Sequence, residues 1–385
     1  MKSWKISLCA LCVGIMIFFP HILHWSFRYV LYLVADLYLV VYVLKKCKRH
    51  ELGSPILLLS FLMVLMNVYN LPYSKKYGNF IIGVLFAVFL YCLERVIYIQ
   101  KRKGTLDIFI KHIYKISVWA NILNCISVLV LWEHRDSSLT VYYLGTKFSS
   151  SFLFLFSVLL YYTYQKKNGL LNKIRMIILI IGSMIFDYTV GCMSALIVSV
   201  IMLMLFVFSS RCMDKVLGNQ IVLLVAIVIA GTFPFWSNLA LNNQVIQYLI
   251  LNVFHKNLSL TGRIKIYECI PEIVKARPFT GYGYGTKIVE RTVGYGNIQN
   301  GLLSILIQYG IMVTILFVII CIHYLKNLKN DNKKGNAFLY MAYGLIAISA
   351  IEVPYDDFLF FFILFLAKYL PGYISETHSV AKDGD

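Results

Sequence analysis

Long apolar runs, one after another, constrain this chain more than any other feature of its sequence. A membrane-spanning helix needs about 20 mostly apolar residues, and runs of roughly that kind fill most of the 385 positions. The composition agrees, because 59% of the residues are hydrophobic and 14% are charged, against about 45–50% and about 25% in soluble domains. The sequence therefore predicts an all-α, polytopic integral membrane protein.

About twelve spans are expected if each apolar run crosses the membrane once. Most prolines lie at the ends of these runs, where a missing N–H costs least, and no predicted span is interrupted at its middle. The nine cysteines show no metal-ligand spacing and imply no disulfide framework. The predicted spans are 6–19, 27–44, 55–71, 80–97, 108–131, 148–164, 174–186, 190–208, 221–236, 298–323, 338–353 and 358–370.

The lysines and arginines predict the orientation, because cytoplasmic loops carry an excess of them. Alternate loops are basic, beginning with Lys45, Lys46, Lys48 and Arg49. An even number of spans then places both termini in the cytoplasm, and the membrane is expected to be the plasma membrane. Most of the net charge of +18 follows from this topology, so nucleic acid is not an expected partner. The expected organisation is nine spans in 1–237, an exterior loop in 238–297, three spans in 298–370 and a cytoplasmic tail in 371–385.

We expect the exterior loop to carry the function. A long loop is translocated largely regardless of its charge, so the topology does not explain why this loop is basic. Its apolar spacing predicts an amphipathic helix over 243–256, and Thr261 is placed to cap a second helix that ends near Ala276, before Pro278. Three arginines, Arg263, Arg277 and Arg291, have the fork geometry that binds phosphate. Snorkelling towards lipid phosphates is the alternative interpretation of each arginine.

Glycine and tyrosine alternate after Pro278, at Gly281, Tyr282, Gly283 and Tyr284. Such a segment combines close backbone approach with flat aromatic faces, which suit sugar rings. A packed loop with tyrosines at the headgroup level is the alternative.

These residues resemble a block of the O-antigen ligase/polymerase superfamily, which includes the Wzy-type oligosaccharide polymerases. The block reads Thr-Gly-Arg-Ile-Lys-Ile-Tyr over 261–267, then Glu-Ile-Val-Lys-Ala-Arg-Pro over 272–278 and Phe-Thr-Gly-Tyr-Gly over 279–283, with Asn300 ahead of the next span. Ligases of this superfamily commonly carry histidine before that asparagine, whereas this chain has Gln299. The departure favours a polymerase of repeat units over a ligase.

The resemblance implies a GT-C-like glycosyltransferase architecture and a metal-independent, cofactor-free transfer of an undecaprenyl-diphosphate-linked oligosaccharide to a sugar hydroxyl. A flippase and a chain-length regulator are implied as pathway partners beside the lipid bilayer itself. By resemblance, Arg263 stabilises the leaving diphosphate, and Glu268 or Glu272 is the first candidate for the base, with Glu290, His255, Asp356 and Asp357 as further candidates. The expected substrate-binding residues are Arg135, Tyr267, Arg277, Gly281, Tyr282, Gly283, Tyr284, Arg291, Asn300, Asp356 and Asp357.

A flippase of lipid-linked oligosaccharides is the alternative function, since it also has about twelve spans and basic residues. Three acidic sites near apolar runs have open interpretations. Asp36 lies deepest and is expected either to be functional or to pair with Arg95 or Arg28. Asp187 and the pair Asp356 and Asp357 are expected to form a solvated acidic rim or to act as base or acceptor-binding groups, and binding of a divalent cation is a further alternative for the pair.

Overall fold

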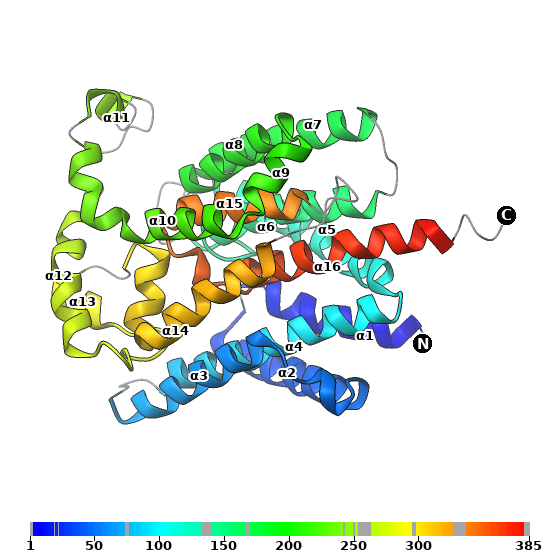
Figure 1. The fold of residues 1–385 in the computed structure, drawn as a ribbon, viewed down its shortest axis with the longest axis horizontal. Coiled ribbons are helices and arrows are strands. Elements are labelled where there is room, and N and C mark those ends of the chain that lie inside the picture. Colours follow the sequence, from blue (N-terminus) through cyan, green and yellow to red (C-terminus); the bar gives the residue numbers. More distant parts are fainter. Residues whose placement is uncertain are drawn as a thin grey trace.

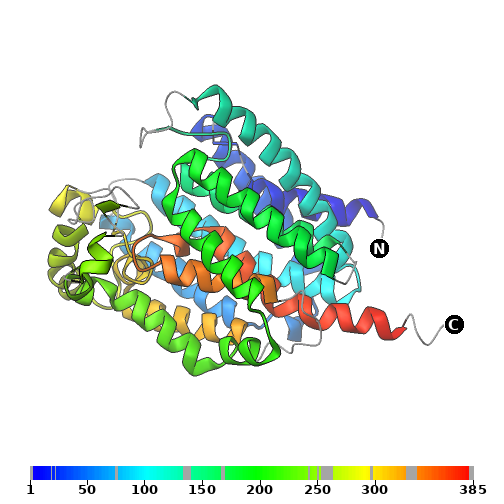
Figure 2. The same ribbon diagram turned by 90° about the horizontal axis from the view of Figure 1, so that it is seen from above.

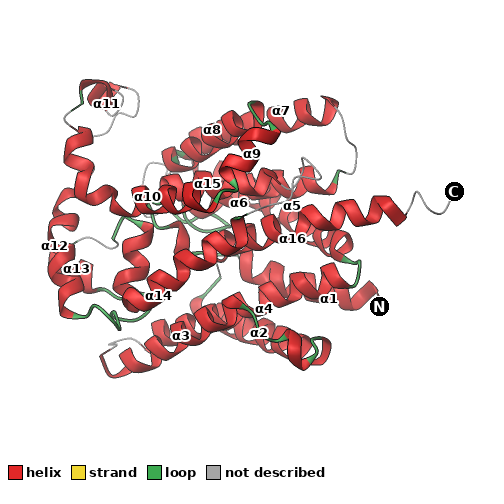
Figure 3. Cartoon of the chain, in the orientation of Figure 1, coloured by secondary structure: helices red, strands yellow, loops and turns green. Residues whose placement is uncertain are grey.

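The structure is a computed structural model of the chain. It describes residues 3–18, 20–21, 23–73, 77–132, 140–165, 170–241, 243–248, 251–252, 263–294, 298–326 and 336–380. These ranges are helical apart from short connections, and they contain no β-strand beyond an isolated bridge between Tyr142 and Gly145 (Figure 3). The helices are α1 (Ser3–Ile17), α2 (Trp25–Lys46), α3 (Pro55–Asn70), α4 (Tyr77–Arg102), α5 (Leu106–Val130), α6 (Lys147–Tyr164), α7 (Leu170–Val190), α8 (Met193–Val207), α9 (Arg211–Leu217), α10 (Gln220–Leu241), α11 (Gln244–Tyr248), α12 (Arg263–Ala276), α13 (Ile288–Val293), α14 (Gly301–Leu325), α15 (Asn336–Ile348) and α16 (Phe358–Val380), with the short 3-10 turns η1 (Arg49–Glu51), η2 (Leu71–Tyr73) and η6 (Pro354–Asp356).

The fold class predicted from the sequence is confirmed. Each predicted span coincides with one helix, namely α1 to α8, α10 and α14 to α16. Four helical segments of the described chain, Ser26–Lys46, Gly78–Arg102, Leu106–Val130 and Gly301–Leu325, are long and apolar enough to cross a membrane by length and composition. Six shorter apolar helices accompany them. The chain is thus an all-α polytopic membrane protein.

The centre of the bundle is α16, whose residues from Leu359 to Ala367 are buried on every side. A helix that is apolar all round is buried in a core. It packs against α4, α14 and α15, while α2 with α3 and α7 with α8 form opposite flanks (Figures 1 and 2). Helices α11, α12 and α13 gather at one end of the bundle, and both termini lie towards the opposite end (Figure 1). Which end is cytoplasmic stays a prediction.

Several boundaries differ from the predicted spans. Helix α10 continues to Leu241 with Pro234 inside it, and α16 continues to Val380, well into the predicted tail. The tenth span, predicted as one uninterrupted helix, is broken at Gly310, whose backbone has φ 79° and ψ 178°. The predicted helix that ends at Ala276 is confirmed as α12, although Thr261 lies outside the described residues. Of the predicted helix over 243–256, the structure describes α11 and residues 251–252.

The predicted ion pairs of Asp36 are wrong. Arg95 pairs with its neighbour Glu94 and donates to the carbonyl of Glu51 at 2.6 Å, whereas Arg28 donates to the carbonyl of His21 at 3.3 Å. Within the described chain, the buried carboxylate oxygens of Asp36 have no hydrogen-bond partner.

Asp187 does not belong to a solvated rim. Its side chain is fully buried and accepts a hydrogen bond from Ser199 at 2.8 Å between α7 and α8. A buried carboxylate depends on such donors for its stability, so Asp187 is part of the interior.

Asn300 supplies a hydrogen bond that helix α10 lacks because of its proline. Pro234 has no N–H, so it leaves the carbonyl of Ala230, four residues earlier, without its helical donor. The Asn300 side-chain amide, which is fully buried, donates to that carbonyl at 3.0 Å and to the Ala350 carbonyl at 3.2 Å. Its oxygen accepts from Leu303 N at 3.0 Å and so caps α14. These contacts give Asn300 a structural role that joins α10, α14 and the end of α15.

We expect Asn300→Ala to destabilise the protein by about 2–4 kcal/mol, because it removes a helix cap and buried hydrogen bonds. In a Pro234→Ala background the cost should fall by about 1 kcal/mol, since the new N–H of residue 234 satisfies Ala230. Melting of the four purified variants in detergent gives the double-mutant cycle. Equal costs in the two backgrounds would show that Asn300 does not compensate for Pro234.

Candidate functional site

The glycine-tyrosine loop, residues 277–285, is inserted into the break of α14. In a continuous helix Ile307 O would accept from Ile311 N. Here Ile307 O accepts from Tyr282 N at 2.9 Å, and Ile311 N donates instead to Pro278 O at 2.8 Å. Gln308 O accepts from Gly283 N at 2.8 Å. The loop therefore supplies the backbone partners that the broken helix lacks, which permits non-helical backbone among spanning helices.

Glycine is required where loop and helix meet. Gly281 has φ +59°, and a Cβ at this position would lie 2.5 Å from Gln308 O. Gly310 has φ +79°, and a Cβ there would overlap the Phe279 carbonyl. At both positions a side chain is excluded for two reasons: the backbone is left-handed, and a Cβ would overlap backbone atoms of the other segment.

Asparagines of α3 and α4 hold the loop from the other side. Asn70 Nδ2 donates to Thr280 O at 3.0 Å, and Asn67 Oδ1 accepts from Tyr284 N at 2.9 Å. Asn79 Nδ2 donates to Gly285 O at 2.8 Å. Asn67 and Asn70 are buried, so these bonds replace water that the loop backbone would otherwise need.

Arg277 lies at the start of the loop and is bound by the protein itself. Its Nη1 donates to Asn70 Oδ1 at 3.0 Å, and its guanidinium carbon lies 5.3 Å from the centre of the Tyr282 ring. The Tyr282 hydroxyl donates to Ile273 O at 2.9 Å. Arg277, which was expected to bind phosphate, thus connects the loop to α3 through its hydrogen bond with Asn70.

Helix α12 is amphipathic, and its two faces separate the residues that the sequence singled out. Ile266, Ile270 and Ile273 share the buried face with Tyr267, against α13 and the first half of α14. The Tyr267 hydroxyl donates to Gln299 O at 3.0 Å, which holds Gln299 at φ 57°. A non-glycine residue with positive φ is strained and persists only when its surroundings hold it there.

The predicted acidic residues of this region face away from that core. Glu268 and Glu272 are exposed and, among the described residues, form no hydrogen bond. In α13 Arg291 is exposed, and Glu290 pairs with Lys287. Arg135 and His255 lie outside the described residues, and the side chains of Arg263 and Asp356 are likewise not described. Among the side chains that the structure describes, no ion pair or hydrogen bond joins Glu268, Glu272 or Glu290 to Arg277 or Arg291.

A different set of polar residues adjoins the loop. The Tyr284 ring stacks on Phe86 with centroids 5.8 Å apart, and Phe86 stacks on Phe358 at 4.9 Å, directly after Asp357. This packing favours the packed-loop interpretation of Tyr284. Asp357 is exposed at the start of α16, and its Oδ1 accepts from Leu359 N at 3.1 Å.

Arg28 and Tyr32 lie one helical turn apart on α2, so their side chains share a face of that helix. Arg28 is 8% exposed, and both Arg28 and Asp357 lie close enough to interact electrostatically with the Tyr32 hydroxyl. Burial, with the neighbouring Arg28 charge, lowers the pKa of His21 to about 4, so His21 is neutral at pH 7. Asp357 therefore adjoins the glycine-tyrosine loop through Phe358, Phe86 and Tyr284, while the buried Arg28 is bonded to the backbone of the neutral His21.

Neither asparagine of α3 was predicted from the sequence, and Arg28 was expected only as an alternative partner of Asp36. A signal was present, because Asn67 and Asn70 are three residues apart on one face of an apolar helix. His21 and Arg28 likewise interrupt the apolar sequence between the first two spans. Within the described chain, no cluster of three His, Cys, Asp or Glu side chains is arranged to hold a metal ion.

Residues 137–318 match the sequence model of the O-Antigen ligase family. The matched region begins ahead of α6 and ends within the second half of α14, so it includes α12, the inserted loop and the break at Gly310. This match supports the resemblance to the O-antigen ligase/polymerase superfamily, whose members are membrane enzymes that transfer glycans. No curated protein matches the chain.

Two glycines with positive φ test the insertion of the loop. A Cβ at Gly294, φ +80°, would meet nothing within 4 Å, whereas one at Gly281 meets the backbone of α14. Gly294→Ala should cost about 1–2 kcal/mol from the left-handed backbone alone. Gly281→Ala adds the steric overlap and should cost more than about 4 kcal/mol or prevent folding. Melting temperature and limited proteolysis in detergent compare them, and similar losses for both would contradict the packed insertion.

Proposed function

We propose that this protein is a polymerase of oligosaccharide repeat units carried on undecaprenyl diphosphate, acting at the outer face of the plasma membrane. The growing chain leaves its lipid diphosphate and is joined to a sugar hydroxyl of the next lipid-linked unit. The family match over the inserted loop and α12 carries this proposal. Gln299, in place of the histidine common among ligases, favours a polymerase. A flippase and a chain-length regulator are its proposed pathway partners.

The leaving diphosphate develops charge, which preorganised cations stabilise. Arg263 is our first candidate, because it begins α12, where the helix dipole also favours an anion. A second cation is needed for a diphosphate. Arg28 is our candidate for that role in place of Arg277. Arg277 is held by both Asn70 and Tyr282, whereas Arg28, bonded to the His21 carbonyl, acts on the same Tyr32 hydroxyl as Asp357.

The attacking hydroxyl needs a base within hydrogen-bond reach. Asp357 is our candidate, because it adjoins the loop through Phe358, Phe86 and Tyr284. Glu268 and Glu272 lie on the outward face of α12, so they are less well placed. We propose that donor and acceptor bind against the inserted loop, which positions them for reaction. Such positioning can contribute much of the rate enhancement.

The proposed activity is tested with purified protein and purified lipid-linked repeat unit in detergent. We expect longer lipid-linked chains from the wild type and a loss of roughly 100- to 1000-fold in rate for Arg263→Ala, with unchanged melting temperature. Arg263→Lys should recover part of the rate, because a point charge replaces a bidentate fork.

Three other outcomes would contradict this proposal. No elongation, together with transport of the lipid-linked unit in vesicles, indicates a flippase. Transfer only to an acceptor that carries no polyprenyl lipid indicates a ligase. Near-wild-type elongation by Arg263→Ala removes Arg263 from the catalytic role.

The position of the base is tested by two charge-neutralising variants. Asp357→Asn should lower elongation by about 100-fold or more, since a general base contributes about 10²–10⁴-fold. Glu272→Gln, on the outward face of α12, is the matched control and should change the rate less than about threefold. The same assay measures both, with protein levels compared after purification. The opposite ranking would place the base on α12.

A further inference from the structure

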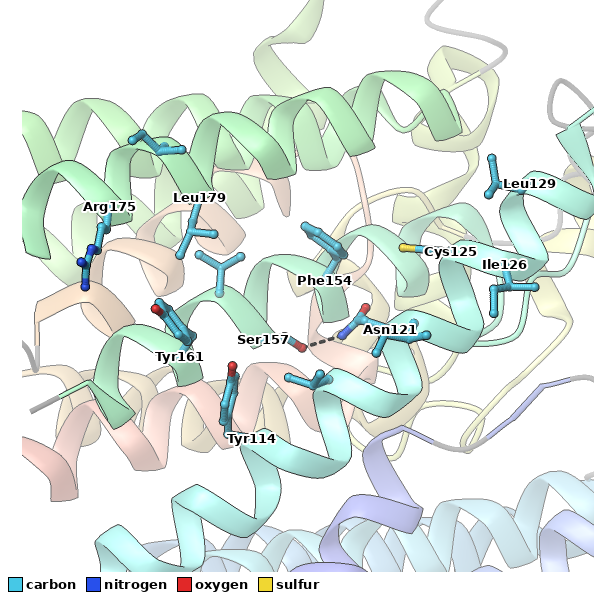
Figure 4. A pocket seen from close by; sticks show the side chains of 14 residues that line it. Tyr114, Asn121, Cys125, Ile126, Leu129, Phe154, Ser157, Tyr161, Arg175 and Leu179 are labelled. Atoms are coloured by element: carbon cyan, nitrogen blue, oxygen red, sulfur yellow. Dashed lines mark hydrogen bonds between the residues drawn. The ribbon is translucent and has the colours of Figure 1, made fainter.

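A long apolar groove lies between α5, α6 and α7, on the flank of the bundle away from α2 and α3 (Figure 4). Its volume is about 640 Å³, which is in the range of ligand-binding cavities. Lining residues on α5 run from Tyr114 to Leu129. At about 1.5 Å per residue the groove follows this helix for about 22 Å, longer than half of the roughly 30 Å hydrocarbon core.

One end of the groove is polar. Arg175, near the start of α7, is the one charged residue among the described residues that line it, and the hydroxyls of Tyr114 and Tyr161 lie at the same end (Figure 4). Arg175 is exposed and, within the described chain, has no hydrogen bond. Lys111 and Lys115, exposed on the first turns of α5, extend the positive charge beyond this end.

The remainder of the groove makes few polar demands on an occupant. The Asn121 amide donates to Ser157 Oγ at 2.6 Å and to Ser117 O at 2.8 Å, so the protein engages its donor, and its Oδ1 is the buried acceptor without a partner among the described residues that line the groove. At the far end the Phe154 ring stacks on Phe186 with centroids 4.6 Å apart. An occupant therefore needs an apolar body and an anionic head.

The polar end and the glycan-transfer site lie at opposite ends of the bundle. Arg175 is near the first residue of α7, whereas the last residues of α7 lead into α8, where Ser194 bonds to Glu352 close to η6. The glycine-tyrosine loop belongs to that second end. A lipid whose anion sits on Arg175 therefore has its head in the leaflet opposite the proposed reaction.

We infer that this groove binds an anionic phospholipid, with its phosphate on Arg175 and its acyl chains between α5, α6 and α7. Arginine binds phosphate bidentately, and the apolar walls remove the chains from the surrounding bilayer. The geometry disfavours the tail of the lipid diphosphate donor, because its head would need a cation at the apolar end. This inference is independent of the proposed polymerase activity.

Lipid binding is measured by native mass spectrometry of the full-length protein released from detergent containing phosphatidylglycerol or phosphatidylcholine. The wild type should retain phosphatidylglycerol preferentially. Arg175→Gln should weaken that retention about tenfold, since a charge-assisted phosphate contact is lost. Lys45→Gln, an exposed cation at the end of α2 outside the groove, is the matched control and should leave it unchanged.

A second pair of variants tests the apolar body of the site. Ile122→Trp fills the groove and should reduce retention of the phospholipid, whereas Ile108→Trp, exposed on the same helix but outside the lining, should not. Equal retention of both lipids, or full retention by Arg175→Gln, would overturn the inference. Arg175-dependent displacement by undecaprenyl diphosphate would also overturn it, because the groove would then belong to the donor.

Discussion

The need to pair every backbone N–H and C=O inside the membrane governs how this chain is packed. Among spanning helices there is little water to bind an unpaired N–H or C=O, so each such group must find a protein partner. Helix α14 is broken at Gly310, and the break persists because Pro278, Tyr282 and Gly283 provide the missing partners from the inserted loop. The break and the loop therefore depend on each other, and a substitution in either is expected to affect both.

Asparagine side chains serve the same purpose at several places in the bundle. Asn300 satisfies the carbonyl that Pro234 leaves open, while Asn67 and Asn70 bind the loop backbone from α3. A side-chain amide has both donors and an acceptor, so one residue can join two or three segments. The buried asparagines thus explain how irregular segments are held rigidly next to the proposed reaction site.

This rigidity changes which residues are credible in glycan transfer. Arg277 and Tyr267 carry expected substrate roles, yet both are bonded to the protein and support the loop and Gln299. Asp357 adjoins the loop through Phe358, Phe86 and Tyr284 instead, and Arg28 and Asp357 both act electrostatically on Tyr32. In the proposed site, α2, α12 and α16 therefore supply the charged residues. Helices α3 and α14 and the inserted loop support them.

The class of fold follows from the apolar runs alone, because runs of spanning length have no stable alternative to helices in a bilayer. The amphipathic spacing of α12 and the proline after Arg277 likewise determined that helix and its end. The break in α14 and the pairing of Arg95 with Glu94 instead of Asp36 became visible only in the packed bundle. An apolar run that contains glycine looks the same whether or not its helix is broken, since the deciding hydrogen bonds come from a loop about thirty residues earlier. Local pattern determines helices, whereas the partners of buried polar groups depend on which distant segments are packed against them.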